Sequence, residues 1–370
     1  MLPNSSRFTN DYTNMLKGVA LLFLLCNHFC VVKDWVTPPN ELMDIMIHGK
    51  PCLGYIGAFG KICVAIWAFL SGIGAYYSYR KDILSAYKSN IVRLANLMIQ
   101  YVLILAVVFI PVIALCQPTF MGEQYELDFK HIIYNIFACD AEYDKAAWYM
   151  RFYIMFVLSF PVIAGLRKRI SSGAVFYIGL FLLFLFLPKL FSLIKENAML
   201  GTIFLKQALG EYCNYILIVI TGYLIAEYNL FENFQKKCGP KMNLVFAVLF
   251  LIFSMALRSY SKTIHLGVID VYTDILITPF VVYSFFVFFQ CLGDNIKHLF
   301  VYIGKASMVA WLVHWIFNVG VPEIQMIAYF PKVSYLVILW VLMICLGFNR
   351  VFSYLIMKSN ILIKTKKIKR

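Results

Sequence analysis

Two histidines lie inside apolar runs of the chain, where a titratable side chain is costly. His28 lies near the end of a run that begins at about residue 15, and His314 lies in a run at about residues 303–320. An ionisable residue within a membrane span commonly faces an internal cavity and serves function. Imidazole transfers protons well near neutral pH. We therefore predict that His28 is a catalytic base and that His314 is its partner; for each, an interhelical hydrogen bond is the alternative.

A polar stripe leads to His28 along the same run. Lys17 precedes His28 by eleven residues, so on a helix both lie on one stripe about 16 Å apart. Asn14 falls within about 40° of His28 on that helix. The stripe predicts a path for an anionic ligand. The alternative for Lys17 is a lysine that reaches the lipid headgroups and sets the orientation of the span.

Ser71 and Gly72 lie near the middle of a second apolar run, at about residues 62–79. Because both residues are small, they allow either a ligand or a neighbouring helix to approach the backbone closely. Ser71, with Asn27 and His314, is a candidate donor to a developing oxyanion. Because no carboxylate at metal-ligand spacing accompanies the histidines, we expect no metal site.

The elements that must position these residues are membrane spans. The chain of 370 residues is 62% hydrophobic and only 14% charged, whereas soluble domains are about half apolar and a quarter charged. We therefore predict an all-α, polytopic transmembrane bundle that occupies residues 1–370 as a single domain. Ten apolar runs are long enough to span: about 15–33, 62–79, 92–116, 148–166, 173–191, 210–227, 242–258, 267–290, 303–320 and 333–357.

The basic residues orient the bundle. Twenty of the 33 Lys and Arg residues fall on the side that holds the N-terminus, twelve fall on the other, and Arg350 lies within the last run. This bias predicts that both termini, including the basic tail 358–370, are cytoplasmic. The longest connection, 117–147, is then an outer loop, which we expect to be partly ordered. The net charge of +14 is scattered between apolar runs, so it does not indicate nucleic-acid binding.

The spacing of Lys17 and His28 resembles the arginine-or-lysine-x10-histidine motif of the membrane acyltransferase-3 family. Three further segments are similar to the looser motifs of that family: Phe69-Leu70-Ser71-Gly72, Trp148-Tyr149 and Leu312-Val313-His314. The resemblance covers nearly the whole chain. It departs from the pattern where many members have Asp in place of Asn14 and Arg in place of Lys17. Many members also carry paired arginines before the third span, where this chain has Arg93.

The resemblance implies transfer of an acyl group, usually acetyl, from acetyl-CoA to a hydroxyl of a cell-surface sugar, polysaccharide or glycolipid. It implies a multi-pass protein of the plasma or inner cell membrane. In this chain the catalytic candidates are His28, His314 and Ser71. The candidates for binding the coenzyme are Lys17, Asn14, Arg93 and Lys88.

Two other functions fit the composition. A proton-coupled exporter of a lipid-linked sugar or polysaccharide would use Asp270, Asp274 and Arg350, but the chain shows no inverted repeat. A glycan polymerase or ligase would use loop 117–147 as its catalytic cap, and it leaves the Lys17–His28 stripe unexplained.

Overall fold

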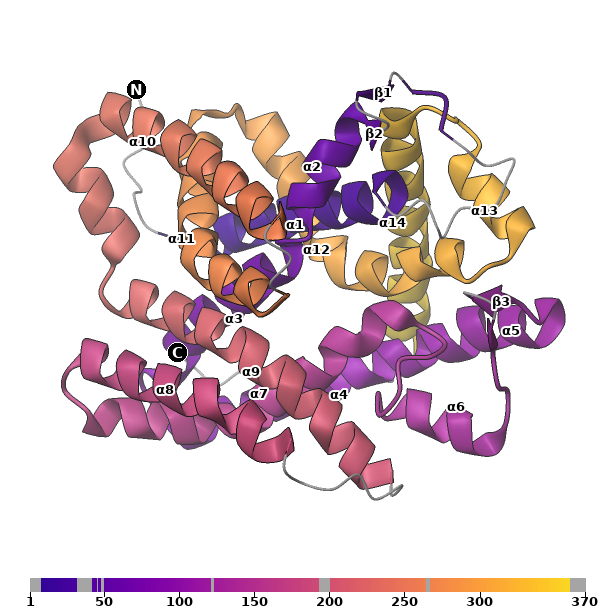
Figure 1. Ribbon diagram of the computed structural model, residues 1–370, viewed down its shortest axis with the longest axis horizontal. Coiled ribbons are helices and arrows are strands. Elements are labelled where there is room, and N and C mark those ends of the chain that lie inside the picture. The colour runs from indigo at the N-terminus through magenta and orange to yellow at the C-terminus, as the bar shows by residue number, and fades with distance from the viewer. Residues whose placement is uncertain are drawn as a thin grey trace. The chain divides into compact units, whose positions relative to one another are not determined.

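Helices make up nearly all of the structure, a computed structural model that describes residues 8–31, 42–44, 46–47, 50–120, 123–192, 200–263 and 267–359. In chain order the longer helices are α1 (Asn10–Cys30), α3 (Cys63–Tyr79), α4 (Ile83–Ile104), α7 (Trp148–Arg169), α8 (Gly173–Ser192), α9 (Leu200–Glu227), α10 (Leu230–Thr263), α11 (Gly267–Cys291), α12 (Asp294–Val313) and α14 (Ser334–Ser359) (Figure 1). The expected all-α polytopic class is confirmed.

Shorter elements connect or extend these helices. They are α2 (Cys52–Gly60), the π-helix η2 (Leu105–Phe109), α5 (Ile110–Cys116), α6 (Phe129–Ile136), the 3₁₀ helices η3 (Lys145–Ala147) and η4 (His314–Asn318), and α13 (Pro322–Tyr329). Two small antiparallel ribbons pair β1 (Met46–Ile47) with β2 (Lys50–Pro51) and β3 (Thr119–Phe120) with β4 (Glu123–Gln124). The loop 117–147 therefore contains a ribbon and a helix, in agreement with the prediction that it is partly ordered.

Within the described part of the chain, nine helical stretches are long and apolar enough to cross a membrane: Asn10–Cys30, Cys52–Tyr79, Ile83–Cys116, Lys145–Arg169, Gln207–Glu227, Leu230–Ser261, Tyr272–Cys291, Asp294–Asn318 and Ser334–Lys358. They coincide with nine of the ten predicted runs. The remaining run, 173–191, corresponds to α8, whose stretch Gly173–Leu187 is apolar but shorter. The basic tail beyond Ser359 lies outside the described residues.

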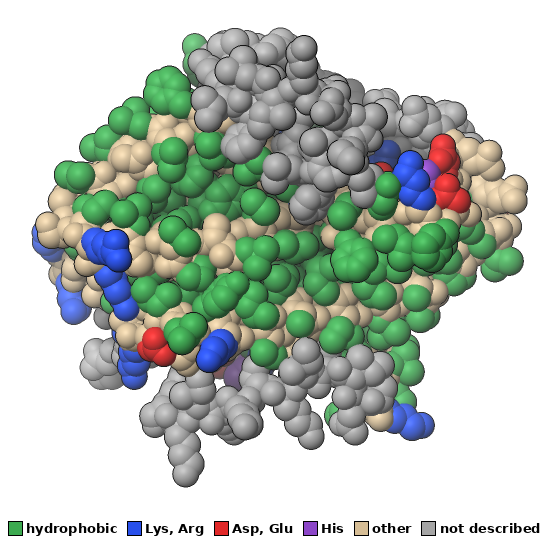
Figure 2. All heavy atoms as spheres, turned by 90° about the horizontal axis from the view of Figure 1, so that it is seen from below, with side chains coloured by type: hydrophobic (Ala, Val, Ile, Leu, Met, Phe, Trp, Pro, Cys, Tyr) green, Lys and Arg blue, Asp and Glu red, His purple; other side chains and the backbone are tan. Residues whose placement is uncertain are grey.

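Exposed hydrophobic side chains support the assignment to a membrane. Along α10, for example, Val245, Leu249 and Ile252 are exposed although each is strongly apolar. They recur at helical spacing, so one stripe of the helix presents only hydrocarbon. Figure 2 shows hydrophobic side chains gathered over much of the described surface on one face. Such a surface suits lipid, because in water patches of this size are rare.

The chain divides into two compact units, each drawn from several parts of the sequence. The first unit comprises residues 1–20, 62–86 and 158–305, and the second comprises 21–61, 87–157 and 306–370. Each unit is described by itself below.

In the first unit, α3 and α9 pack at a close crossing of two glycines. A Cβ at Gly72 of α3 would lie 1.9 Å from the carbonyl oxygen of Val219, and one at Gly222 of α9 would lie 2.2 Å from that of Phe69. Each glycine therefore lets the backbone of the other helix approach. Of the two alternatives predicted for the Ser71-Gly72 segment, the structure shows close approach to a neighbouring helix for Gly72.

Also in the first unit, hydrogen bonds join α10 to α11. The Ser284 hydroxyl donates to the Ala247 carbonyl oxygen at 2.7 Å, and the Tyr283 hydroxyl donates to Asn243 Oδ1 at 2.8 Å. Side-chain hydrogen bonds of this kind fix the register of helices in lipid.

In the second unit, α2 packs on the end of α1. A Cβ at Gly57 would lie 2.3 Å from the Cys26 carbonyl oxygen. At the same crossing, Asn27 Nδ2 donates to the Gly57 carbonyl oxygen at 2.8 Å. The turn of α1 that carries His28 is thereby held by its neighbour.

Candidate functional site

The two predicted histidines meet in the second unit. His28 lies near the C-terminal end of α1, and His314 is the first residue of η4. His28 Nδ1 and His314 Nε2 are 2.9 Å apart, which is hydrogen-bond distance. The His314 side chain is fully buried, whereas that of His28 is partly exposed. Residues separated by 286 positions in the sequence thus form one imidazole pair. This contact is also the interhelical hydrogen bond of the alternative, so the catalytic role of the pair stays a prediction.

The bonding of His314 determines where the protons of the pair lie. The other ring nitrogen, His314 Nδ1, is hydrogen-bonded to the backbone carbonyl oxygen of Trp311. A carbonyl oxygen only accepts, so Nδ1 carries the proton, and in a neutral ring Nε2 must accept. The Nδ1–H of His28 therefore donates to His314 Nε2. This tautomer, assigned from the bonding, leaves the lone pair of His28 on its Nε2.

Aromatic rings surround the pair. The ring of Trp315 stands edge-on to His28, with centroids 5.7 Å apart and planes at 81°. Trp311, whose carbonyl oxygen orients His314, packs edge-on against Tyr149 of α7, with centroids 5.8 Å apart. The His314 imidazole is fully buried, and in such surroundings hydrogen bonds and developing charges interact more strongly than in water.

Ser71 and Asn27, two of the predicted oxyanion donors, each have a hydrogen bond in the structure. The Ser71 hydroxyl donates to the Trp67 carbonyl oxygen at 2.9 Å, one turn earlier on α3. Asn27 Nδ2 is bonded to α2 as described above. Ser71 belongs to the first unit and Asn27 to the second. The role of Ser71 in catalysis stays a prediction.

Asn14 and Lys17 lie on α1, the helix that also carries His28. A Cβ at Gly304 of α12 would lie 1.7 Å from the Asn14 carbonyl oxygen, so the two helix backbones are in contact at this point in the first unit. The side chains of Asn14 and Lys17 are both partly exposed. The continuous helix predicted for residues 14–28 is confirmed. That these side chains bind a coenzyme stays a prediction.

Lys88 and Arg93 lie on a helix and not in a loop. Helix α4 begins at Ile83, about nine residues before the predicted start of the third span. Both side chains are exposed, and Arg93 Nη1 donates to Asn90 Oδ1 at 3.3 Å. A separation of five residues places them about 140° apart around the helix. They can therefore contact one polyanion only if it wraps around α4.

An ion pair that the sequence did not reveal lies between α10 and α11 in the first unit. Arg258 Nη1 donates to the carboxylate of Asp274, and both side chains are buried. Arg350, named with Asp274 in the exporter hypothesis, is exposed and belongs to the second unit. Because Arg258 closes the predicted span 242–258 and Asp274 lies in the first third of the next, 267–290, antiparallel packing of adjacent spans was the signal that could have paired them.

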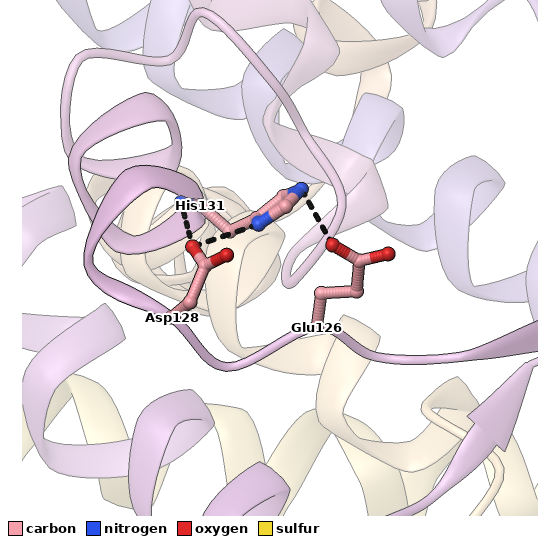
Figure 3. Close-up of side chains that lie close together, drawn as sticks. All are labelled: Glu126, Asp128 and His131. Atoms are coloured by element: carbon pink, nitrogen blue, oxygen red, sulfur yellow. Dashed lines mark hydrogen bonds and ion pairs between the residues drawn. The ribbon is translucent and has the colours of Figure 1, made fainter.

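A cluster of two carboxylates and a histidine lies in loop 117–147 (Figure 3). Asp128 Oδ1 accepts from the backbone N–H of His131 at 2.7 Å and lies 2.8 Å from its ring Nδ1, while Glu126 Oε2 lies 3.2 Å from Nε2. Among the described residues, these three form the one group close enough to hold a metal ion. Since each ring nitrogen already faces a carboxylate, a protonated imidazole satisfies the cluster without a metal.

The electrostatics of this cluster agree with a protonated ring. Burial lowers the pKa of His131, but the hydrogen bond to Asp128 and the charges of Asp128, Glu142 and Glu126 outweigh it, so the pKa is raised above its ordinary value. Hydrogen bonds from the backbone N–H and ring of His131 lower the pKa of Asp128. The ion pairs of His131 with Glu126 and Asp128 therefore hold the start of α6 against the segment that precedes it.

Comparison with known proteins gives one match. A family model for the acyltransferase-3 family, described as an acyltransferase domain, matches residues 10–357, nearly the whole chain. The match includes both histidines of the pair and every span. No curated protein and no solved structure matches the chain.

Proposed function

Because the chain belongs to the acyltransferase-3 family, we propose that this membrane acyltransferase moves an acetyl group from acetyl-CoA to a hydroxyl of a cell-surface sugar, polysaccharide or glycolipid. The observation that carries the proposal is the hydrogen-bonded pair of His28 and His314. The pair supplies what acyl transfer to a hydroxyl needs, namely a base whose tautomer is set by a second group.

The reaction begins at His28 Nε2. This nitrogen takes the proton of the acceptor hydroxyl while the hydroxyl oxygen attacks the carbonyl carbon of the thioester. The new C–O bond forms, the C–S bond breaks, and the thiolate of coenzyme A leaves with the proton that His28 Nε2 returns. A base in this position contributes about 10²–10⁴-fold to the rate. Transient acylation of His28 is the variant route.

His314 acts through His28. When His28 becomes positively charged, its Nδ1–H donates more strongly to His314 Nε2, because hydrogen bonds from charged groups are stronger than neutral ones. His314 thereby stabilises the charged form of the base and keeps Nε2 directed at the acceptor. The Trp311 carbonyl oxygen in turn fixes His314. This is the arrangement of a nucleophile, a base and an orienting group, with a neutral imidazole as the third member.

The proposed donor site lies along α1. Lys17 would bind a phosphate of the coenzyme, and the thioester arm would follow the Asn14–Lys17–His28 stripe of α1. Lys88 and Arg93, on α4 in the second unit, are proposed as phosphate-binding residues within their own unit. Cations suit a polyanion, and Arg can bind phosphate through two parallel hydrogen bonds. The oxyanion role proposed for Ser71 requires its hydroxyl to leave the Trp67 carbonyl oxygen. No metal enters the proposed mechanism.

The exporter alternative rests on unpaired charges in the spans. Asp274 is neutralised by Arg258 within the first unit, and a paired carboxylate is a poorer proton carrier than an isolated one. The side chain of Asp270 lies outside the described residues. We therefore do not propose transport as a second function.

The test is incubation of the purified protein with radiolabelled acetyl-CoA and a membrane glycolipid extract, followed by analysis of the sugar for label. We expect labelled sugar from the wild type and none from His28→Ala, with both proteins monodisperse in detergent. His298→Ala is the matched control, because His298 is exposed on α12 and far along the helix from His314. Saturable binding of acetyl-CoA without transfer by the wild type would contradict the proposal.

A further inference from the structure

Among the described residues, the amide of a buried asparagine four residues beyond His314 has no hydrogen-bond partner at either end. Asn318 is the last residue of η4 and is 1% exposed. Within the described residues, neither Asn318 Nδ2 nor Asn318 Oδ1 has a hydrogen-bond partner. Burial of an amide without a partner costs free energy, so native proteins bond almost all such groups. An exception near a reactive pair requires an explanation.

The other buried asparagines of the described chain make the contrast clear. Asn135 Nδ2 donates to the His131 carbonyl oxygen at 2.9 Å, and its Oδ1 accepts from the Tyr143 N–H at 3.0 Å. Asn243 is bonded at both ends as well, to the Gln235 carbonyl oxygen at 2.9 Å and to the Tyr283 hydroxyl at 2.8 Å. This protein therefore bonds its structural asparagines fully.

The position of Asn318 relates it to the reactive pair in the second unit. On a 3₁₀ helix, residues three apart lie above one another, so Asn318 lies below Trp315 on the same face. The Trp315 ring packs edge-on against His28. Asn318 is also four residues beyond His314, about 8 Å further along the helix at 2.0 Å per residue. The amide therefore lies past the histidines, on the side away from α12.

The chemistry of the amide selects among the groups of a substrate. Asn offers two N–H donors and one carbonyl acceptor. A phosphate or a thioester carbonyl only accepts, so it would leave Oδ1 without a partner; an amide of the pantetheine arm could bond both ends, and the KM for acetyl-CoA in the test below separates that case from a sugar. A hydroxyl both donates and accepts, so neighbouring hydroxyls of a sugar can satisfy Nδ2 and Oδ1 together. Because a sugar ring carries several hydroxyls, one can meet the base while another meets an amide some ångströms away.

We propose that Asn318 binds the sugar acceptor through a hydroxyl other than the one that is acylated. This inference rests on the proposed function and adds a residue that positions the acceptor. Asn318 would then contribute to the choice of acceptor, because an analogue without that hydroxyl leaves a buried amide unbonded, which is how hydrogen-bonding sites reject such analogues.

The experiment compares two isosteric variants, Asn318→Leu and Asn135→Leu, in thermal stability and in transfer of radiolabelled acetyl to a membrane glycolipid extract. Asn318→Leu removes no hydrogen bond made by the described residues, so its melting temperature should equal or exceed that of the wild type. Asn135→Leu removes two hydrogen bonds and should melt lower. If Asn135→Leu does not accumulate, Asn243→Leu serves as the bonded control.

In the transfer assay, Asn318→Leu should lower kcat/KM for the glycolipid about tenfold, the worth of one substrate hydrogen bond, and leave the KM for acetyl-CoA unchanged. Asn318→Asp, which keeps the shape and the acceptor but loses the donor, should also be impaired. A fall in melting temperature as large as that of Asn135→Leu would overturn the inference. So would unchanged acceptor kinetics, or a rise in KM for acetyl-CoA alone, which would assign the amide to the donor.

The two proposals fail differently. If the wild type transfers no acetyl group, the proposed function is wrong and the acceptor assignment falls with it. If the wild type is active and Asn318→Leu matches it, the function stands and only the role of Asn318 is wrong.

Discussion

Replacement of His314 tests whether the pair works as one unit. His314→Leu removes the Nε2 acceptor that lies 2.9 Å from His28 Nδ1. In the proposed mechanism His28 becomes positively charged during transfer, and a hydrogen bond to a charged group is worth about 1.5–3 kcal/mol. Loss of that bond in the transition state alone predicts a fall in kcat of about 10- to 150-fold. The fall is smaller than for His28→Ala, because the base itself is retained.

A second substitution separates orientation from size. Glutamine at position 314 keeps a side-chain oxygen that can accept from His28 Nδ1, so His314→Gln should recover part of the rate that His314→Leu loses. Because the two histidines act together, the double variant His28→Ala/His314→Leu should be no slower than His28→Ala alone.

The assay is initial rate of acetyl transfer at saturating acetyl-CoA, with melting temperature measured on each variant so that a folding defect is recognised. A His314→Leu enzyme within about threefold of the wild type would refute the reasoning, because such a change is less than the weakest bond to a charged group. A double variant much slower than His28→Ala would show that the histidines act separately.

Three further predictions concern the coenzyme, the packing and the outer loop. Lys17→Ala should raise the KM for acetyl-CoA more than it lowers kcat, and an unchanged KM would remove Lys17 from the phosphate site. Gly72→Ala should destabilise the protein by several kcal/mol, of the order of the largest core defects, because the added Cβ meets a carbonyl oxygen at 1.9 Å. Gly74→Ala should stabilise the protein by about 0.5–1 kcal/mol, because a Cβ at Gly74 would have no described atom within 4 Å. Thermal melting of both variants checks the contrast. Because the pKa of His131 is raised, its protonated form stabilises loop 117–147; this stabilisation is full below the unfolded pKa of about 6.5 and is lost as the pH rises through the folded value. Amide hydrogen exchange of α6 should therefore be slower at pH 5.5 than at pH 8.5 after correction for intrinsic rates. Asp128→Asn should abolish the difference.

The class of fold follows from the sequence because lipid leaves few choices. A long apolar run in a bilayer must satisfy its backbone internally, so each run becomes a helix. Nine predicted runs lie in membrane-length helices of the described chain. The ends were less predictable: α4 begins in a polar segment at Ile83, because a helix continues past the lipid wherever its backbone hydrogen bonds are better made internally than with water.

The site was predictable only in part. The position of both histidines inside apolar runs led to the prediction that they are partners, and the 2.9 Å contact agrees. The direction of the hydrogen bond was not readable, because it depends on a backbone carbonyl oxygen at a change from α- to 3₁₀-helix. Asn318 gave no signal, because one asparagine in an apolar run looks the same whether its amide is bonded or not. Partner identity is a tertiary property, as the Arg258–Asp274 pair also illustrates.

The hydrogen bond from His314 to Trp311 has a consequence for how this site can vary. The acceptor is a main-chain oxygen, which every amino acid at position 311 would supply. Substitution there can change the packing against Tyr149, but it cannot remove the group that assigns the tautomer. In the proposed mechanism, substitution of Trp311 therefore leaves the tautomers of His314 and His28 unchanged.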